Sequence, residues 1–153
     1  MTSAELITNH IVPLENTTTV GRAIELMNDY HVRELPVVHD NKYTGLLCFE
    51  DIEHLNEDIT VAECASLLKQ VFVNSSDFFL VPLRKMHQQQ LTLLPVVEDE
   101  AQLKGVITEE ELLQAASHYN AASEPGGVII LLVPPNDLSI SEIGRIVESN
   151  NAK

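Results

Sequence analysis

The stretch His31-Val-Arg-Glu-Leu-Pro-Val-Val-His-Asp40 decides the fold, because the chain carries a second version of it. The second version reads Gln90-Leu-Thr-Leu-Leu-Pro-Val-Val-Glu-Asp99. The two prolines, Pro36 and Pro95, are 59 positions apart. A chain that repeats an apolar, β-type stretch at a fixed period is expected to contain two copies of one supersecondary unit.

The repeat extends well beyond these stretches. It keeps the offset of 59 on the N-terminal side of the prolines and takes an offset of 60 on the C-terminal side. The aligned pairs are Val12 with Val71, Met27 with Met86, Gly45 with Gly105, and Asp51 with Glu111. One additional residue is therefore predicted in the second hairpin turn, where an insertion costs little free energy.

The first copy predicts a helix, two strands and a second helix. Thr18 or Thr19 can cap a helix that ends near Tyr30-His31. Its apolar positions recur at helical spacing, at Val20, Ala23, Ile24 and Met27. Strands are predicted at residues 35–38 and 43–48, with a turn at 40–42 between them and a helix from residue 49 onward.

The second copy predicts the same order of elements. Asp77 is expected to cap a helix that carries Leu80, Leu83 and Met86. Strands are predicted at residues 93–97 and 103–107, and a helix at 109–118. Between the copies, Thr60-Val-Ala-Glu63 has the form of a capping box that opens a helix through Leu68.

The order of elements predicts a mixed α/β (α+β) fold. The first repeat is assigned to residues 1–60, the second to 61–122, a Pro- and Gly-containing linker to 123–127, and a C-terminal β-α unit to 128–153. This unit would consist of a strand at 128–133 and a helix that begins at the capping box Ser139-Ile-Ser-Glu142 and runs to about Asn150. One strand and one helix cannot bury enough apolar area alone, so either the chain continues into a further domain or this tail packs on the repeats or on another chain.

The composition limits the partners that the chain can take. Its 153 residues carry a formal net charge of −14 with only nine Lys and Arg, so neither nucleic acid nor an anionic membrane is expected as a partner. Cys48 and Cys64 lie in no metal-ligand pattern and are interpreted as buried thiols in a reducing compartment. No secretory leader follows Met1 and no apolar run is long enough for a membrane span, so a soluble, cytoplasmic protein is expected.

Both copies resemble the CBS motif. The resemblance rests on the Leu-Pro-Val-Val strand and on the segments Gly45-Leu-Leu-Cys-Phe-Glu-Asp51 and Gly105-Val-Ile-Thr-Glu-Glu-Glu111, and it covers roughly residues 4–119. It implies a tandem pair, or Bateman module, in which two β-α-β-β-α units pack through their sheets as a disc. Such discs usually form homodimers, and many bind adenine nucleotides or S-adenosylmethionine as regulatory ligands, with no cofactor required.

The resemblance also implies where a ligand would bind, since the strand-to-helix junction of one repeat faces the Leu-Pro strand of the other. One cleft would be formed by Cys48, Asp51, Thr92, Leu93, Leu94 and Pro95. The other would be formed by Thr108, Glu111, Arg33, Glu34, Leu35 and Pro36. In each cleft the carboxylate would accept hydrogen bonds from a ribose, and the hydroxyl residue and helix N-terminus would hold a phosphate. The hairpin glycine would let the backbone approach the ligand, and Arg33 is the cation that this mapping brings to a phosphate.

Each copy departs from the family pattern at one position. Cys48 replaces the usual serine or threonine, so a weak hydrogen-bond donor stands where a good one is usual. Glu111 replaces aspartate and carries its carboxylate one methylene further out. Two hypotheses therefore remain open: a regulatory sensor of an adenosine-containing ligand, and a scaffold that dimerises or recruits a partner without any ligand.

The tail resembles the first strand and helix of an ACT-like domain. The segments that carry this resemblance are Gly127-Val-Ile-Ile-Leu-Leu-Val133 and Leu138-Ser-Ile-Ser-Glu-Ile-Gly-Arg-Ile-Val147. The loop Pro134-Pro-Asn-Asp-Leu138 lacks the glycine that usually faces an amino-acid ligand in such domains. Among small proteins with both kinds of domain, the acetoin-utilisation type has the most similar architecture.

No combination of residues in the sequence indicates an enzyme. The six histidines show no spacing typical of a metal site, and no metal is expected. The acidic pairs at Glu50-Asp51 and Glu109–Glu111 fall where helix first turns favour acids, and no nucleophile accompanies them. The sequence therefore predicts a binding module rather than a catalyst.

Overall fold

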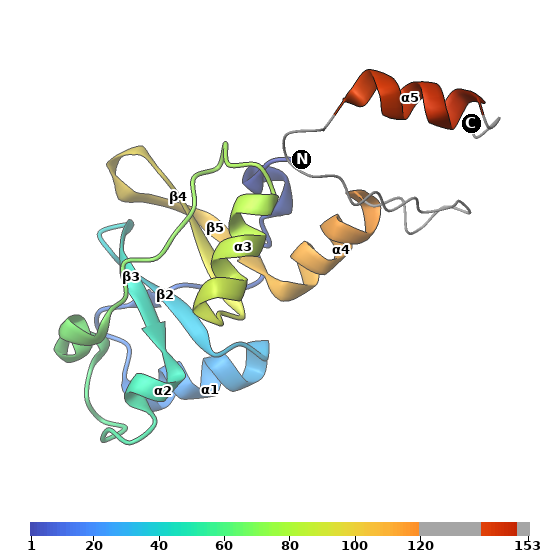
Figure 1. Cartoon of the computed structure of the whole chain (residues 1–153). Helices are drawn as coiled ribbons and strands as arrows, with labels where there is room; N and C mark the ends of the chain where they lie inside the picture. The colour runs from blue at the N-terminus through green and yellow to red at the C-terminus, as the bar shows by residue number, and fades with distance from the viewer. Residues whose placement is uncertain (120–138, 150–153) are drawn as a thin grey trace. The chain divides into compact units, whose positions relative to one another are not determined.

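The computed structural model describes residues 1–119 and 139–149. The chain divides into two units, one within residues 1–123 and one within 124–153. The first unit contains both repeats, and the second contains the helix α5 (Ile140–Ser149) (Figure 1).

The first repeat contains the elements that the sequence predicts. They are α1 (Val20–Tyr30), β2 (Glu34–His39), β3 (Lys42–Cys48) and α2 (Phe49–Ile52). The Thr19 side chain caps α1 by accepting a hydrogen bond from the backbone N–H of Arg22, as expected of a helix N-cap. The helix ends at His31, which takes a left-handed conformation with a φ of 56°.

The second repeat has the same order. It comprises α3 (Leu80–Gln89), β4 (Leu93–Glu98), β5 (Gln102–Thr108) and α4 (Glu109–Tyr119). Gln90 ends α3 in the left-handed conformation, with a φ of 54°, at the position that matches His31. The predicted cap at Asp77 is wrong, because α3 begins after Phe79. The Asp77 carboxylate instead accepts a hydrogen bond from the backbone N–H of Asn74 at 2.9 Å and closes the turn before the helix.

The two hairpins differ by one residue in their turns, as the shift from 59 to 60 predicts. Asp40 and Asn41 connect β2 to β3, and both have a positive φ. Three residues, Asp99–Ala101, connect β4 to β5. Each hairpin also changes register at the same place, between Val37 and Val38 and between Val96 and Val97, so the bulge repeats as well.

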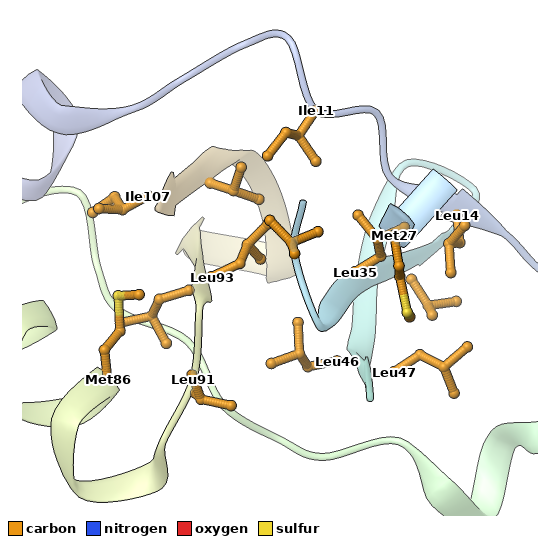
Figure 2. Close-up of a cluster of buried hydrophobic side chains, with 14 of the residues drawn as sticks. Ile11, Leu14, Met27, Leu35, Leu46, Leu47, Met86, Leu91, Leu93 and Ile107 are labelled. Carbon is orange, nitrogen blue, oxygen red and sulfur yellow. The ribbon is translucent and has the colours of Figure 1, made fainter. Parts of the chain in front are cut away.

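The strands form a sheet in the order β1-β2-β3-β5-β4, where β1 (Leu14–Glu15) is a short strand that runs parallel to β2. The two hairpins meet through one paired position, Lys42 with Gln102. The two hairpins therefore share little of the ladder of backbone hydrogen bonds. A single cluster of buried hydrophobic residues, drawn in part in Figure 2, includes Leu35 and Leu46 from the first repeat and Met86 and Leu93 from the second.

The segment that leads into each repeat crosses the hairpin of the other repeat. Leu46 in β3 exchanges two backbone hydrogen bonds with Lys69, both of 2.9 Å, although Lys69 lies in the second repeat, before its helix α3. In the same way Thr8, which lies in the first repeat before α1, donates its backbone N–H to the carbonyl of Val106 in β5. The 3-10 helices Ser3–Leu6 and Val61–Leu67 lie just before these crossings, and the second opens with the predicted Thr60–Glu63 capping box.

These crossings give the hairpin glycines a different role from the one expected of them. A Cβ atom on Gly45, whose φ is +154°, would lie 2.7 Å from Leu68 Cβ. One on Gly105, with a φ of +152°, would collide with the Ile7 side chain. The glycines thus make room for the crossing segments of the chain itself, whereas the sequence interpretation reserved that room for a ligand.

The second unit is described only through α5. The Ser139 hydroxyl oxygen accepts a hydrogen bond from the backbone N–H of Glu142 at 3.3 Å, so α5 begins at the predicted capping residue. The predicted strand at residues 128–133 lies outside the described residues. None of the helices described in the structure combines the length and the apolar character needed to cross a membrane.

Candidate functional site

The junction between β3 and α2 places Cys48 and Asp51 beside a cation that the sequence mapping did not include. Lys69 Nζ lies 3.3 Å from Asp51 Oδ2, and Lys69 is also close enough to Cys48 to act on the pKa of its thiol. Lys69 reaches this junction because its backbone is paired with Leu46, two residues before Cys48. The Lys69 side chain is 50% exposed and that of Asp51 is 32% exposed, so solvent or a ligand can reach the pair.

The protonation states of this group follow from its surroundings. Burial raises the pKa of the Cys48 thiol, and the nearby Lys69 offsets that effect only in part. Cys48 is therefore a neutral thiol at neutral pH. Partial burial acts to lower the pKa of Lys69, but Cys48 and Asp51 outweigh it and the pKa of Lys69 is raised. Asp51 is thus the carboxylate that pairs with Lys69.

Glu34 and Thr92 connect the two repeats. The Thr92 hydroxyl and backbone N–H both donate to Glu34 Oε2, at 2.7 and 3.0 Å. The Thr92 hydroxyl oxygen in turn accepts the backbone N–H of Arg33 at 2.9 Å. Glu34 is 3% exposed, and burial raises the pKa of its carboxyl although the hydrogen bonds from Thr92 oppose the effect.

Arg33 is held by groups of its own repeat. Its Nε donates to Glu50 Oε1 at 2.7 Å, and its guanidinium carbon lies 5.4 Å from the centre of the Phe49 ring. Slight burial acts to raise the pKa of Glu50, but its own backbone N–H and Arg33 lower it overall. The first turn of α2 therefore carries two carboxylates, Glu50 and Asp51, and each is paired with one half-exposed cation.

In the second repeat, the two predicted residues Thr108 and Glu111 are hydrogen bonded to each other. The backbone N–H of Thr108 donates to Glu111 Oε2 at 3.0 Å, and the Thr108 hydroxyl donates to the same oxygen. Glu111 thereby caps the start of α4. Among the contacts described for residues 1–119, none joins Thr108 or Glu111 to the residues 33–36 that the mapping placed opposite them. The structure instead brings Arg33 and Glu34 to Thr92.

The remaining predicted residues belong to the core. Leu35, Leu93 and Leu94 are fully buried, and Pro36 and Pro95 lie in strand segments that are buried throughout. These buried residues support the polar residues from within the core, and a ligand cannot reach them in this arrangement.

A groove that the sequence did not indicate lies between α3 and α4. Its volume is about 480 Å³, and six of its lining residues are apolar: Leu83, Met86, Leu91, Leu112, Leu113 and Ala116. Leu113 is 74% exposed. The sequence predicts Leu83 as an apolar position of α3, but the exposure of Leu83 depends on how α3 and α4 pack.

The family model for the CBS domain matches the chain twice, over residues 4–57 and 49–118. The chain belongs to the CBS-domain family. Both copies of the repeat are thus CBS motifs, and the resemblance inferred from the two Leu-Pro-Val-Val stretches is confirmed.

Known proteins with CBS domains share the sequence at a moderate level. The chain is 29% identical over 119 residues to an inosine-5'-monophosphate dehydrogenase of Methanocaldococcus jannaschii, and 27% identical over 122 residues to a homoserine O-acetyltransferase of Methanobrevibacter ruminantium. These matches cover 76% and 75% of the chain but only 24% of each enzyme. The CBS chain therefore spans about a quarter of the length of these relatives.

Solved structures share the fold. A CBS domain pair/ACT domain protein from Thermotoga maritima superposes with a TM-score of 0.69 at 24% identity, covering 78% of this chain and 98% of that one. A protein from Vibrio cholerae assigned to acetoin utilization gives 0.66 at 21% identity, covering 84% and 98%. The protein CBSX2, solved in complex with AMP, gives 0.64 at 21% identity, covering 78% and 98%. The predicted mixed α/β fold of a CBS pair is confirmed.

Proposed function

We propose that this CBS pair is a regulatory module that binds an adenosine-containing ligand and passes its occupancy to other parts of a dimer. The ligand would be AMP, ADP, ATP or S-adenosylmethionine, bound at the β3–α2 junction. The module acts by differential binding to two arrangements of the protein. It is not itself an enzyme, and it works in the cytoplasm without nucleic acid or a membrane as partner.

The polar group at the β3–α2 junction carries this proposal. Asp51 supplies a carboxylate, on a side chain that is 32% exposed, for a ribose diol, and Lys69 and Arg33 supply cations within the same neighbourhood for a phosphate. The AMP complex of CBSX2 and the ATP complex of the cytosolic domain of the Mg²⁺ channel MgtE support an adenine nucleotide as the ligand class.

Isothermal titration with AMP, ADP, ATP and S-adenosylmethionine tests the proposal. At least one ligand is expected to bind with a Kd below millimolar. Asp51→Ala should abolish binding at this junction while leaving the fold intact, because an exposed ion pair contributes at most about 1 kcal/mol to stability. The sensing function is excluded if none of the four ligands binds. If Asp51→Ala binds with unchanged affinity, the ligand uses another site.

The groove between α3 and α4 supports a dimer as the transmitting assembly. Leu83 and Leu113, which line it, are 36% and 74% exposed. An apolar surface of this kind suits a second copy of the same apolar surface better than water. A homodimer that pairs these helices would place the two discs in contact.

A ligand-independent scaffold is the second candidate. Glu111 and Glu34, two of the predicted ligand-binding carboxylates, already accept hydrogen bonds within the chain. A scaffold predicts a dimer in solution and a melting temperature that no nucleotide changes. A shift of the melting temperature with any one of the four ligands would exclude it.

A further inference from the structure

We propose that Lys69 is an internal counter-ion that makes the first site selective for phosphorylated nucleotides. Without ligand, the Lys69 ammonium pairs with Asp51. When a nucleotide binds, the ammonium moves to its phosphate and frees the Asp51 carboxylate to accept hydrogen bonds from the ribose. This inference rests on the proposed function and names the residue that sets the ligand class of its site.

The Lys69 side chain is the part of this segment that can move. The Lys69 backbone is fixed on β3 by two hydrogen bonds to Leu46, and the Tyr43 hydroxyl donates to the carbonyl of Val71, two residues further on, at 2.7 Å. The side-chain amide of Gln70 donates to the carbonyl of Thr44 at 2.6 Å. The segment is therefore anchored at three successive residues, whereas the half-exposed Lys69 side chain has a flexible four-carbon stem.

The exchange gives both Asp51 and Lys69 a new polar partner. Asp51 Oδ2 is a buried atom, and its partner in the described part of the chain is the Lys69 ammonium, 3.3 Å away. A carboxylate in this position needs a cation or hydrogen-bond donors. The hydroxyls of a ribose are such donors, and the phosphate that accompanies them is the anion that the released ammonium needs. An uncharged nucleoside supplies the ribose hydroxyls but no phosphate.

Among the described residues, no lysine or arginine pairs with the matching carboxylate of the second repeat. Thr8 holds the position opposite Val106 that Lys69 holds opposite Leu46, and its hydroxyl is hydrogen bonded to the His10 ring. The corresponding carboxylate, Glu111, accepts its hydrogen bonds from Thr108. The two halves of the CBS pair therefore differ in charge where their folds match, and the phosphate selectivity belongs to the first site.

Titration calorimetry with AMP and adenosine isolates this role, since the two ligands differ only in the phosphate. The wild-type protein should bind AMP more tightly than adenosine, and Lys69→Met should weaken AMP by about tenfold or more while affecting adenosine little. Lys69→Arg retains the charge and should keep the preference for AMP. Lys104→Met is the matched control, because Lys104 makes a comparable exposed pair with Glu98 at 3.4 Å on β5.

Each other outcome overturns the inference in a recognisable way. If Lys69→Met binds AMP as the wild type does, Lys69 has no part in selection, although the proposed function stands. If Lys69→Met binds both AMP and adenosine more tightly than the wild type does, the Lys69 side chain blocks the site and does not bind the phosphate. If the wild type binds neither AMP nor ADP, ATP or S-adenosylmethionine, the proposed function fails and this inference with it.

Discussion

Glu34 is a buried carboxylate whose charge is held by one residue of the other repeat. It lies at the start of β2, and its Oε2 accepts two hydrogen bonds from Thr92, the residue just before β4. A buried carboxylate that crosses between repeats fixes how the two hairpins are placed, because either partner left alone would be an unsatisfied polar group. The same placement makes the stability of the CBS pair depend on pH.

Glu34→Gln should remove one component of this pH dependence. Burial raises the pKa of Glu34 in the folded state, so the folded protein holds this proton more tightly than the unfolded chain does. The stabilisation is full below the ordinary pKa of glutamate and is lost as the pH rises through the raised pKa. Urea denaturation between pH 4 and 8 should show the wild type losing free energy of unfolding relative to Glu34→Gln across that window.

Glu63→Gln is the control of opposite sign for this measurement. Glu63 accepts hydrogen bonds from the backbone N–H and hydroxyl of Thr60, which lower its pKa. Its contribution is present above the ordinary pKa and is lost as the pH falls through the lowered one. If both variants shift the pH profile in the same direction, Glu34 is not the group responsible.

At the scale of elements, the hairpin and the segment that crosses it depend on a glycine. Gly45→Ala should destabilise the CBS pair by about 1–3 kcal/mol, because the new methyl group meets Leu68 and the backbone has a positive φ. Gly144→Ala is the control, since a Cβ there has no neighbour within 4 Å and the position lies inside α5. Chemical denaturation of both variants measures the free energy of unfolding. If Gly45→Ala is as stable as the wild type, the crossing segment can move aside at little cost.

The elements themselves follow from local patterns in the sequence. The apolar spacing from Val20 to Met27 predicts α1, and the Leu-Pro-Val-Val stretches predict β2 and β4 within one residue at each end. The offset of 60 places the additional residue in the correct turn. Asp77 was misplaced because an aspartate closes a turn as readily as it caps a helix, and the spacing alone does not distinguish the two.

The candidate site was only partly predictable for a different reason. Cys48 and Asp51 lie in the motif, and their position at the end of β3 follows from it. Lys69 reaches them only because the segment before α3 crosses the hairpin of the first repeat. An alignment of the two repeats compares equivalent positions, so it does not reveal that a segment of one repeat packs on the other. The available signal was the paired glycines, Gly45 and Gly105, since two matching glycines within strands indicate a close approach of backbone.

At the scale of the whole molecule, the CBS pair combines one shared core with two unlike halves. The buried cluster takes residues from both repeats, so neither repeat is expected to fold without the other. The charged groups do not follow the same symmetry, because Lys69 and Arg33 both serve the β3–α2 junction. The proposed ligand would bind beside the joint between the repeats, and in the proposed dimer a small shift there would alter the packing of one disc on another.

In the proposed dimer, the apolar groove between α3 and α4 is the interface whose packing such a shift would change. The substitution Leu113→Glu tests whether this groove is the dimer interface. Leu113 is 74% exposed, so the substitution leaves the core of one disc intact. A charge buried in an interface between two copies should weaken the dimer by about tenfold or more. Sedimentation velocity across a range of concentrations measures this, with Val12→Glu as the control because Val12 is 57% exposed and lies outside the groove. An unchanged dimer in Leu113→Glu would place the interface on another face of the CBS pair.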